Sequence, residues 1–149
     1  MKVSVLGVFV GGVVDVFSSV LAALPFALYS TFKLDPSQRV GPHASSAVSA
    51  AIHANVPLNS AQLIVGLLCS VLGGYVAAAI AKRHERLNGT LSCYLCVGMG
   101  VITMLVGVGQ DPRWLQFLML IANPAMAFVG GDLRLGQRLR QNRTGIVVG

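Results

Sequence analysis

The chain has 149 residues, of which 54% are apolar and 11% are charged, and its mean hydropathy is +0.72. This composition excludes an ordinary water-soluble domain and favours a protein whose main solvent is lipid. The net charge of +6 comes from basic residues at the ends of apolar runs, and not from a patch interleaved with aromatics, which argues against nucleic-acid binding.

Four apolar runs are each long enough to cross a bilayer as a helix, because about 20 residues at about 1.5 Å each span a hydrocarbon core of about 30 Å. The sequence therefore predicts an all-α, four-helix transmembrane bundle that forms a single domain. The four predicted helices cover approximately residues 3–29, 61–81, 90–108 and 114–130. Only a short link, Gly109 to Arg113, joins the last two, so we expect an antiparallel hairpin.

Basic residues near the ends of these runs predict the orientation of the bundle, since Lys and Arg stay in the cytoplasm during insertion. Eight fall on one side: Lys2, Lys82, Arg83, Arg86, Arg134, Arg138, Arg140 and Arg143. Three fall on the other side: Lys33, Arg39 and Arg113. This bias places both termini and the basic tail, residues 132–149, in the cytoplasm. Leucines and arginines alternate in the tail, which is either an orientation signal or a continuation of the fourth helix along anionic lipid.

The longest connection, residues 31–60, is predicted to lie outside the membrane on the opposite side. Its middle, residues 44–54, is rich in alanine and serine. We interpret it either as a short interfacial helix or as a loop folded over the mouth of the bundle. In the basic connection before the third helix, Asn88 and Gly89 are expected to form a turn, with Thr90 or Ser92 as the helix cap.

Asp15 is the residue most indicative of function, because a carboxylate near the middle of a membrane helix costs about 2.5–3.5 kcal/mol and usually faces the bundle interior. At about 1.5 Å per residue, Asp15 lies roughly 18 Å into the membrane, close to the levels of Ser70 on the second helix and Asn123 on the fourth. We therefore predict a midplane polar cluster of these three residues, with Ser18 and Ser19 one turn from Asp15.

Two interpretations of this cluster stay open. In the first, Asp15 exchanges protons or binds an ion within a coupled transport site. In the second, a protonated Asp15 hydrogen-bonds to Ser or Asn across helices, which stabilises the bundle by about 0.6–2 kcal/mol per contact without transport. Pro25 and Pro124 are similarly either ordinary kinks or helix breaks that line a binding site.

Small residues recur at every fourth position of the second helix. They are Gly66, Ser70, Gly74 and Ala78. Such a face lets two helix backbones approach closely. We expect it to pack either inside the bundle or against another subunit.

No residue pattern predicts catalysis, a cofactor or a metal site. Cys93 and Cys96 have C-x-x-C spacing, but they lie in an apolar run with no His or acid nearby in the sequence, so we interpret them as packing residues. His43, His53 and His84 pair by spacing with no nucleophile or second ligand.

The segments GGYVAAAIAKR, from Gly73 to Arg83, and ERLNG, from Glu85 to Gly89, resemble a helix-loop-helix element of small, uncharacterised multi-pass proteins of bacterial inner membranes. That resemblance implies a location and no activity. An acid in the middle of the first of four helices is similar to small multidrug resistance transporters. Their acid is a glutamate, and they lack an outer link as long as residues 31–60.

From these features we expect a non-enzymatic integral membrane protein that acts as an oligomer or as an accessory subunit of a membrane complex. The alternative is a small ion- or proton-coupled transporter or channel that uses Asp15. The expected partners are the lipid bilayer and either copies of this chain or other membrane subunits.

Overall fold

The computed structural model describes residues 3–82, 84–106 and 112–146, with side chains up to residue 141. The described residues form helices joined by short connections, which confirms the predicted all-α class. Four segments are long and apolar enough to cross a membrane, as expected for a multi-pass membrane protein. These segments are Val5–Lys33, Val56–Ala81, Glu85–Val106 and Arg113–Gln141.

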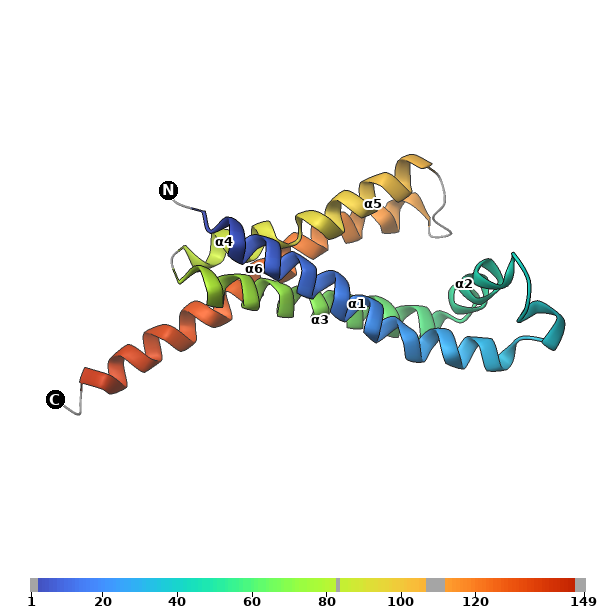
Figure 1. The fold of residues 1–149 in the computed structure, drawn as a ribbon, viewed down its shortest axis with the longest axis horizontal. Coiled ribbons are helices and arrows are strands. Elements are labelled where there is room, and N and C mark those ends of the chain that lie inside the picture. The colour runs from blue at the N-terminus through green and yellow to red at the C-terminus, as the bar shows by residue number, and fades with distance from the viewer. Residues whose placement is uncertain (1–2, 83, 107–111, 147–149) are drawn as a thin grey trace.

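The first two long helices, α1 (Val5–Lys33) and α3 (Val56–Ala81), pack side by side (Figure 1). The side chain of Asn55 caps α3 by accepting a hydrogen bond from the backbone N–H of Leu58 at 3.3 Å. Pro57 follows in the first turn, where a missing N–H costs nothing. The helix therefore begins before the predicted residue 61, because these start signals precede the strongly apolar part of the run.

A short 3-10 helix, η1 (Pro36–Gln38), and a further helix, α2 (Ala44–Ala54), connect α1 to α3. The structure shows that residues 44–54 are helical and that α2 also folds back against α1 and α3, with Ile52 buried. In Figure 1, α2 covers one end of the α1–α3 pair. The segment is thus a helix, as the first interpretation expects, and it folds over one end of the α1–α3 pair, as the second expects. Its position at a membrane surface stays a prediction.

The third membrane segment consists of two helices, α4 (Glu85–Ser92) and α5 (Tyr94–Val106), which meet at Cys93. The predicted turn at Asn88 and Gly89 is wrong, because both residues lie buried within α4. A Cβ atom on Gly89 would come within 2.9 Å of Gly131 Cα, so the glycine allows close helix packing and does not form a turn.

Thr90 and Ser92 do not cap the start of a helix either. The Thr90 hydroxyl donates to the Arg86 carbonyl at 2.9 Å, and the Ser92 hydroxyl donates to the Gly89 carbonyl at 2.7 Å. Both side chains therefore bond back to the preceding turn of α4, as Ser and Thr commonly do inside helices.

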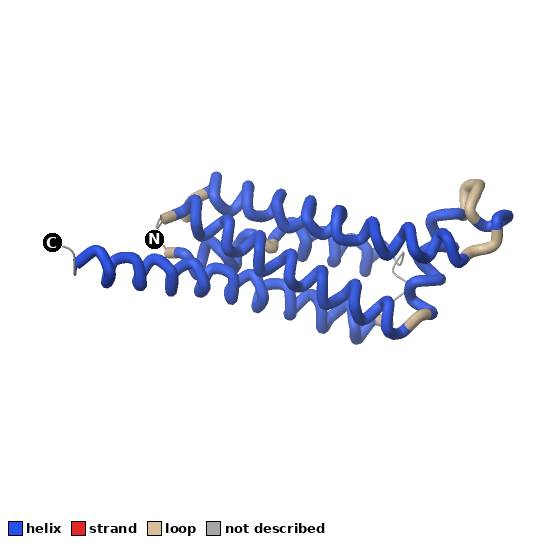
Figure 2. The backbone as a smooth tube through the Cα atoms, turned by 90° about the horizontal axis from the view of Figure 1, so that it is seen from below, coloured by secondary structure: helices blue, strands red, loops and turns tan. Residues whose placement is uncertain are grey.

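The last helix, α6 (Arg113–Ile146), packs on α3 and α4, and its first half lies beside α5. It does not end near residue 130 as predicted. The described part of the basic tail continues the same helix, which projects beyond the other helices in Figures 1 and 2. The predicted link at residues 109–113 lies largely outside the described residues.

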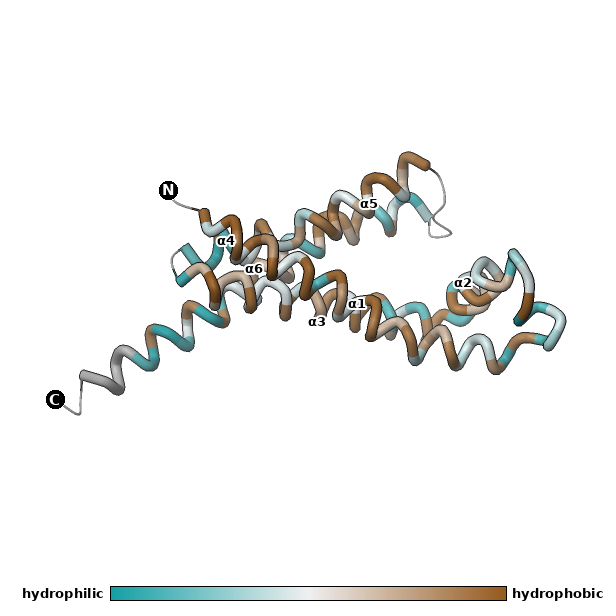
Figure 3. Tube along the Cα trace, in the orientation of Figure 1, coloured by the Kyte–Doolittle hydropathy of each residue, from teal (hydrophilic) through white to brown (hydrophobic). Residues whose placement is uncertain are grey.

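The helices form two arms that diverge from a common crossing region (Figure 1). One arm is the α1–α3 pair, and the other is α5 with the first half of α6. We call the end at the α3–α4 turn the basic end, because Lys82, Arg86, Arg134 and Arg138 lie there, and the end at α2 the open end. The start of α1 and the end of α6 both lie at the basic end. Figure 3 shows apolar residues along both arms and polar residues on the projecting part of α6.

Small residues bring the backbones together where the helices cross. A Cβ on Gly11 would lie 2.7 Å from the Gly73 carbonyl oxygen, so α1 and α3 touch through glycines. On another face of α3, Gly74 lies against the Ala127 backbone of α6, and Gly130 of α6 lies against the Val71 carbonyl. Helix α3 is therefore held between α1 and α6 by close backbone contacts.

The predicted small-residue face of α3 is thus used mainly inside the chain. Ser70, Gly74 and Ala78 are buried in the bundle. Gly66 differs, because no atom lies within 4 Å of the position that its Cβ would take. Of this face, only the part around Gly66 is left without close helix packing.

A candidate binding cavity above Asp15

The structure brings the side chains of Asp15, Ser70 and Asn123 together from three helices. Ser70 Oγ lies 3.1 Å from Asp15 Oδ1 and 3.3 Å from Oδ2, and 3.5 Å from Asn123 Oδ1. Asp15 is 0% exposed and Ser70 is 2% exposed. The hydroxyl therefore joins α1 to α3 and α6 at a site that solvent does not reach directly.

Glycine on the facing helix makes room for this carboxyl group. A Cβ on Gly73 would lie 2.7 Å from Asp15 Cβ and 3.2 Å from Asp15 Cα. On α1 itself, the Ser18 hydroxyl donates to the Asp15 backbone carbonyl at 3.1 Å, which satisfies that hydroxyl within the helix. The close approach of α1 to α3 thus sets the position of Asp15 against Ser70.

A fourth residue of the site, Cys96, is not identified by the sequence. Its side chain on α5 lies next to the Asp15 carboxyl group. An acid distant in the sequence, Asp15, therefore lies near the C-x-x-C pair in the folded chain, contrary to the interpretation from spacing. Cys93 is buried, and its thiol donates to the Thr90 carbonyl at 2.9 Å, as suits a packing residue. Spacing within one helix carries no signal for this contact, which depends on how α5 leans against α1.

A cavity of about 350 Å³ lies between the two arms, next to this cluster. Ligand pockets commonly have about this size, at roughly 300–1,000 Å³. Its polar lining comes from all four long segments and from α2: Ser19, His53, Asn59, Gln62, Cys96, Thr103, Gln116 and Asn123. Aliphatic side chains such as Leu63, Leu67 and Met119 form most of the remaining wall. None of the described residues lining it is Lys, Arg, Asp or Glu.

Asn123 and Cys96 connect the cavity to the buried acid. Both line the cavity, while Asn123 contacts Ser70 and Cys96 contacts Asp15. No ion pair to Asp15 occurs among the described residues, so an ionised carboxylate there has no basic side chain to balance its charge. Because an uncompensated charge is costly away from water, Asp15 requires either a proton or a cation.

Besides the uncompensated charge of Asp15, an unpaired buried atom of Gln62 also indicates that the cavity holds a bound solute or water. Its Oε1 atom is buried, and no hydrogen-bond partner for it exists in the described part of the chain. An unsatisfied buried acceptor typically costs about 1–3 kcal/mol. A bound solute or water that donates a hydrogen bond in the cavity removes this cost.

The cavity is expected to be open to water. Cysteine variants at two neighbouring positions of α6 test this expectation. Gln116 lines the cavity, whereas the adjacent Phe117 is exposed on the outside of the bundle, on the apolar surface expected to face lipid. In membranes, a hydrophilic thiol reagent should label Gln116→Cys about tenfold faster than Phe117→Cys, because the reactive thiolate forms in water and not in hydrocarbon. Wild-type labelling gives the background from the native cysteines. Equal rates for the two variants would mean that the cavity is closed to water.

The described residues contain no group of three or more His, Cys, Asp or Glu side chains placed to hold a metal ion. Comparisons with protein families, with curated proteins and with solved structures find no significant match for this chain.

Proposed function

We propose that the protein is a small multi-pass transporter of a bacterial inner membrane, in which Asp15 exchanges a proton at the base of the cavity. The observation that carries this proposal is the contact of Cys96 and Asn123 with both the cavity and the Asp15–Ser70 pair. An acid that served only to hold helices together would need no polar-lined cavity beside it. These two side chains lie between the cavity and the buried acid.

The proposed orientation places the basic end in the cytoplasm and the open end, with its cavity, outside. The charges of the described residues support this orientation. Lys82, Arg86, Arg134, Arg138 and Arg140 lie toward the basic end, and Lys33, Arg39 and Arg113 lie toward the open end. Under the positive-inside rule, such a bias sets the direction of insertion.

Proton exchange at Asp15 fits the surroundings of its carboxyl group. The protonated form is neutral and suits a buried position, while the ionised form accepts a hydrogen bond from the Ser70 hydroxyl. A cationic or hydrogen-bond-donating solute in the cavity favours the ionised form, because its charge or dipole lies close to the carboxylate. Solute binding in the cavity is thus coupled to proton release at Asp15 through the neighbouring side chains of Cys96 and Asn123.

Asp15→Asn tests the proposal, because the amide keeps the shape and most of the hydrogen bonding but cannot titrate. In infrared spectra of protein reconstituted in lipid, we expect the wild type to lose a protonated-carboxyl band as the pH is raised, and Asp15→Asn to lack that band. A band that persists at every pH at which the protein stays folded would make Asp15 a structural group and overturn the proposal.

A second candidate is an oligomeric or accessory membrane subunit, and α5 is the element that favours it. This helix contacts only α6 and α1 extensively, and no atom lies within 4 Å of a Cβ built on Gly98. Met99, Ile102 and Leu105 on α5 are exposed. Native mass spectrometry of protein extracted gently from its own membrane distinguishes the candidates, since the second requires a defined complex with copies of this chain or with other subunits.

A further inference from the structure

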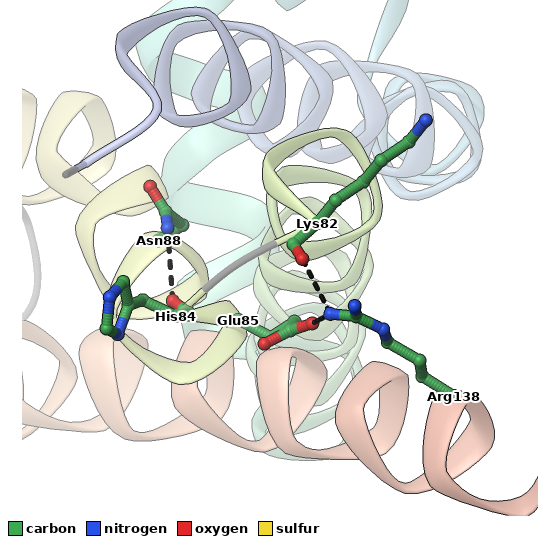
Figure 4. Close-up of polar contacts among 5 residues, drawn as sticks. All are labelled: Lys82, His84, Glu85, Asn88 and Arg138. Atoms are coloured by element: carbon green, nitrogen blue, oxygen red, sulfur yellow. Dashed lines mark hydrogen bonds and ion pairs between the residues drawn. The ribbon is translucent and has the colours of Figure 1, made fainter. Parts of the chain in front are cut away.

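At the basic end, a tight turn and an ion pair join three helices (Figure 4). Lys82 ends α3 in the left-handed conformation, with φ 53°. From α6, Arg138 Nη1 donates both to the Lys82 carbonyl and to Glu85 Oε1, each at 2.6 Å. Glu85 is only 6% exposed, so Arg138 neutralises an almost buried carboxylate. The Lys82 carbonyl and the Glu85 side chain are thereby held against α6.

One turn earlier on α6, Arg134 is held by a different set of contacts. Its guanidinium carbon lies 5.8 Å from the centre of the Tyr75 ring. The Tyr75 hydroxyl donates to Gln137 Oε1 at 2.7 Å, and Arg134 Nη1 donates to the same oxygen at 3.4 Å. Stacking and hydrogen bonding together keep this guanidinium close to α3.

These basic groups surround a cavity of about 170 Å³. Its lining consists of Ala78, Ala79, Lys82, Glu85, Arg134 and Arg138. Glu85 balances Arg138, so the charges of Lys82 and Arg134 have no carboxylate of the cavity to offset them. In Figure 4, the Lys82 side chain extends away from the Arg138–Glu85 pair, which leaves its ammonium group available to another anion.

The cavity also lies at the depth of a lipid headgroup. Lys82 directly follows Ala81, the last residue of a membrane-spanning segment. Ala78 and Ala79, one turn deeper on α3, form an apolar wall below the charges. Basic side chains above a small apolar wall match a phosphate joined to a lipid backbone.

We propose that this cavity binds the phosphate group of an anionic phospholipid of the leaflet at the basic end, with Lys82 and Arg134 as its ligands. Arg138 and Glu85 act as positioning residues, because they hold the turn that carries Lys82. Basic pockets between membrane helices favour such lipids. Each cation that contacts the phosphate directly is expected to contribute about fivefold in affinity, equivalent to about 1 kcal/mol, and a basic residue outside the cavity makes no such contact. The site is separate from the Asp15 cavity and does not depend on transport.

Lipid binding to the full chain in a mild non-ionic detergent tests this assignment, by native mass spectrometry and by titration. We expect phosphatidylglycerol to bind more tightly than phosphatidylcholine or inorganic phosphate. Lys82→Gln and Arg134→Gln should each weaken phosphatidylglycerol binding about fivefold, and the double variant about 25-fold. These variants keep the Arg138–Glu85 pair, and unchanged circular dichroism and elution volume establish that they fold.

Arg140→Gln is the matched control, since Arg140 lies on the same exposed part of α6 but does not line the cavity. It should change phosphatidylglycerol binding less than twofold. A loss equal to that of Arg134→Gln would show diffuse attraction to the basic helix and overturn the site. Equal binding of phosphatidylcholine would overturn the requirement for an anionic lipid, and equally tight binding of inorganic phosphate would overturn the assignment to a lipid.

Discussion

Replacing either Gly130 or Gly74 with alanine is expected to prevent stable folding of the bundle. A Cβ on Gly130 would overlap the Val71 carbonyl and lie 2.7 Å from Tyr75 N, and a Cβ on Gly74 would overlap the Ala127 carbonyl. These neighbours are backbone atoms, which cannot rotate away as a side chain can. Helices α3 and α6 would have to separate, so we expect a loss of at least about 3 kcal/mol, at or above the upper end of ordinary overpacking.

Two other glycines serve as controls in the same helices. Gly136 of α6 and Gly66 of α3 have no atom within 4 Å of their Cβ positions. Alanine at either position should leave stability unchanged or raise it by up to about 1 kcal/mol, because alanine is the better helix former. Elution profiles and thermal midpoints of the detergent-solubilised proteins provide the measurement. A Gly130→Ala protein with the profile and midpoint of Gly136→Ala would contradict the close approach of α3 and α6.

The polar cluster is the part of the site that the sequence predicts most directly. Helical rise is regular, so counting residues from each membrane face places Asp15, Ser70 and Asn123 at similar depths. The high cost of a lipid-facing carboxyl group then requires a partner at that depth. The contacts of Ser70 with Asp15 and Asn123 agree with these two constraints, and the glycine packing of α1 on α3 then brings Asp15 and Ser70 together.

Features that arise between helices are not predictable in this way. The cavity exists because α5 and the first half of α6 lean away from α1 and α3, and neither composition nor periodicity encodes that divergence. Cys96 lies next to Asp15 because α5 also packs on α1, and this contact between helices is likewise not encoded in composition or periodicity. Small residues on α3 indicate close packing, but not whether the partner is another helix of the same chain; here α1 and α6 occupy most of that face.

Several residues of the segments 73–82 and 85–89 hold helices together near the basic end. Gly73 and Gly74 let α1 and α6 approach α3, and Gly89 lets α4 approach α6. Glu85 pairs with Arg138 across to α6. Local preferences suggest a turn at Asn88 and Gly89, because these residues favour turns when nothing else contacts them. In this fold the missing side chain of Gly89 lets α6 pack closely, and the Asn88 amide bonds to the start of α1.

Asn88→Ala is expected to cause the second large loss of stability. Asn88 is 0% exposed, and its Oδ1 accepts a hydrogen bond from Ser4 N at 2.8 Å while its Nδ2 donates to the His84 carbonyl at 3.0 Å. The side chain thus joins the start of α1 to the turn before α4, as Figure 4 shows for His84. Alanine removes both bonds and leaves the part-buried Ser4 N–H without its acceptor, while the His84 carbonyl keeps its bond from Asn88 N. We expect a cost of about 1–3 kcal/mol.

Asn59→Ala is a suitable control for Asn88→Ala, because it makes the same change in a helix at a residue that lines the open cavity. The thermal midpoint of Asn88→Ala should fall well below that of Asn59→Ala. Hydrogen exchange should also show faster exchange at the start of α1 in Asn88→Ala, since Ser4 N loses its acceptor and the N-terminal turn of α1 frays. Equal midpoints, with unchanged exchange at residues 4–8, would mean that α1 is held at the basic end by its glycine contacts with α3 and not by Asn88.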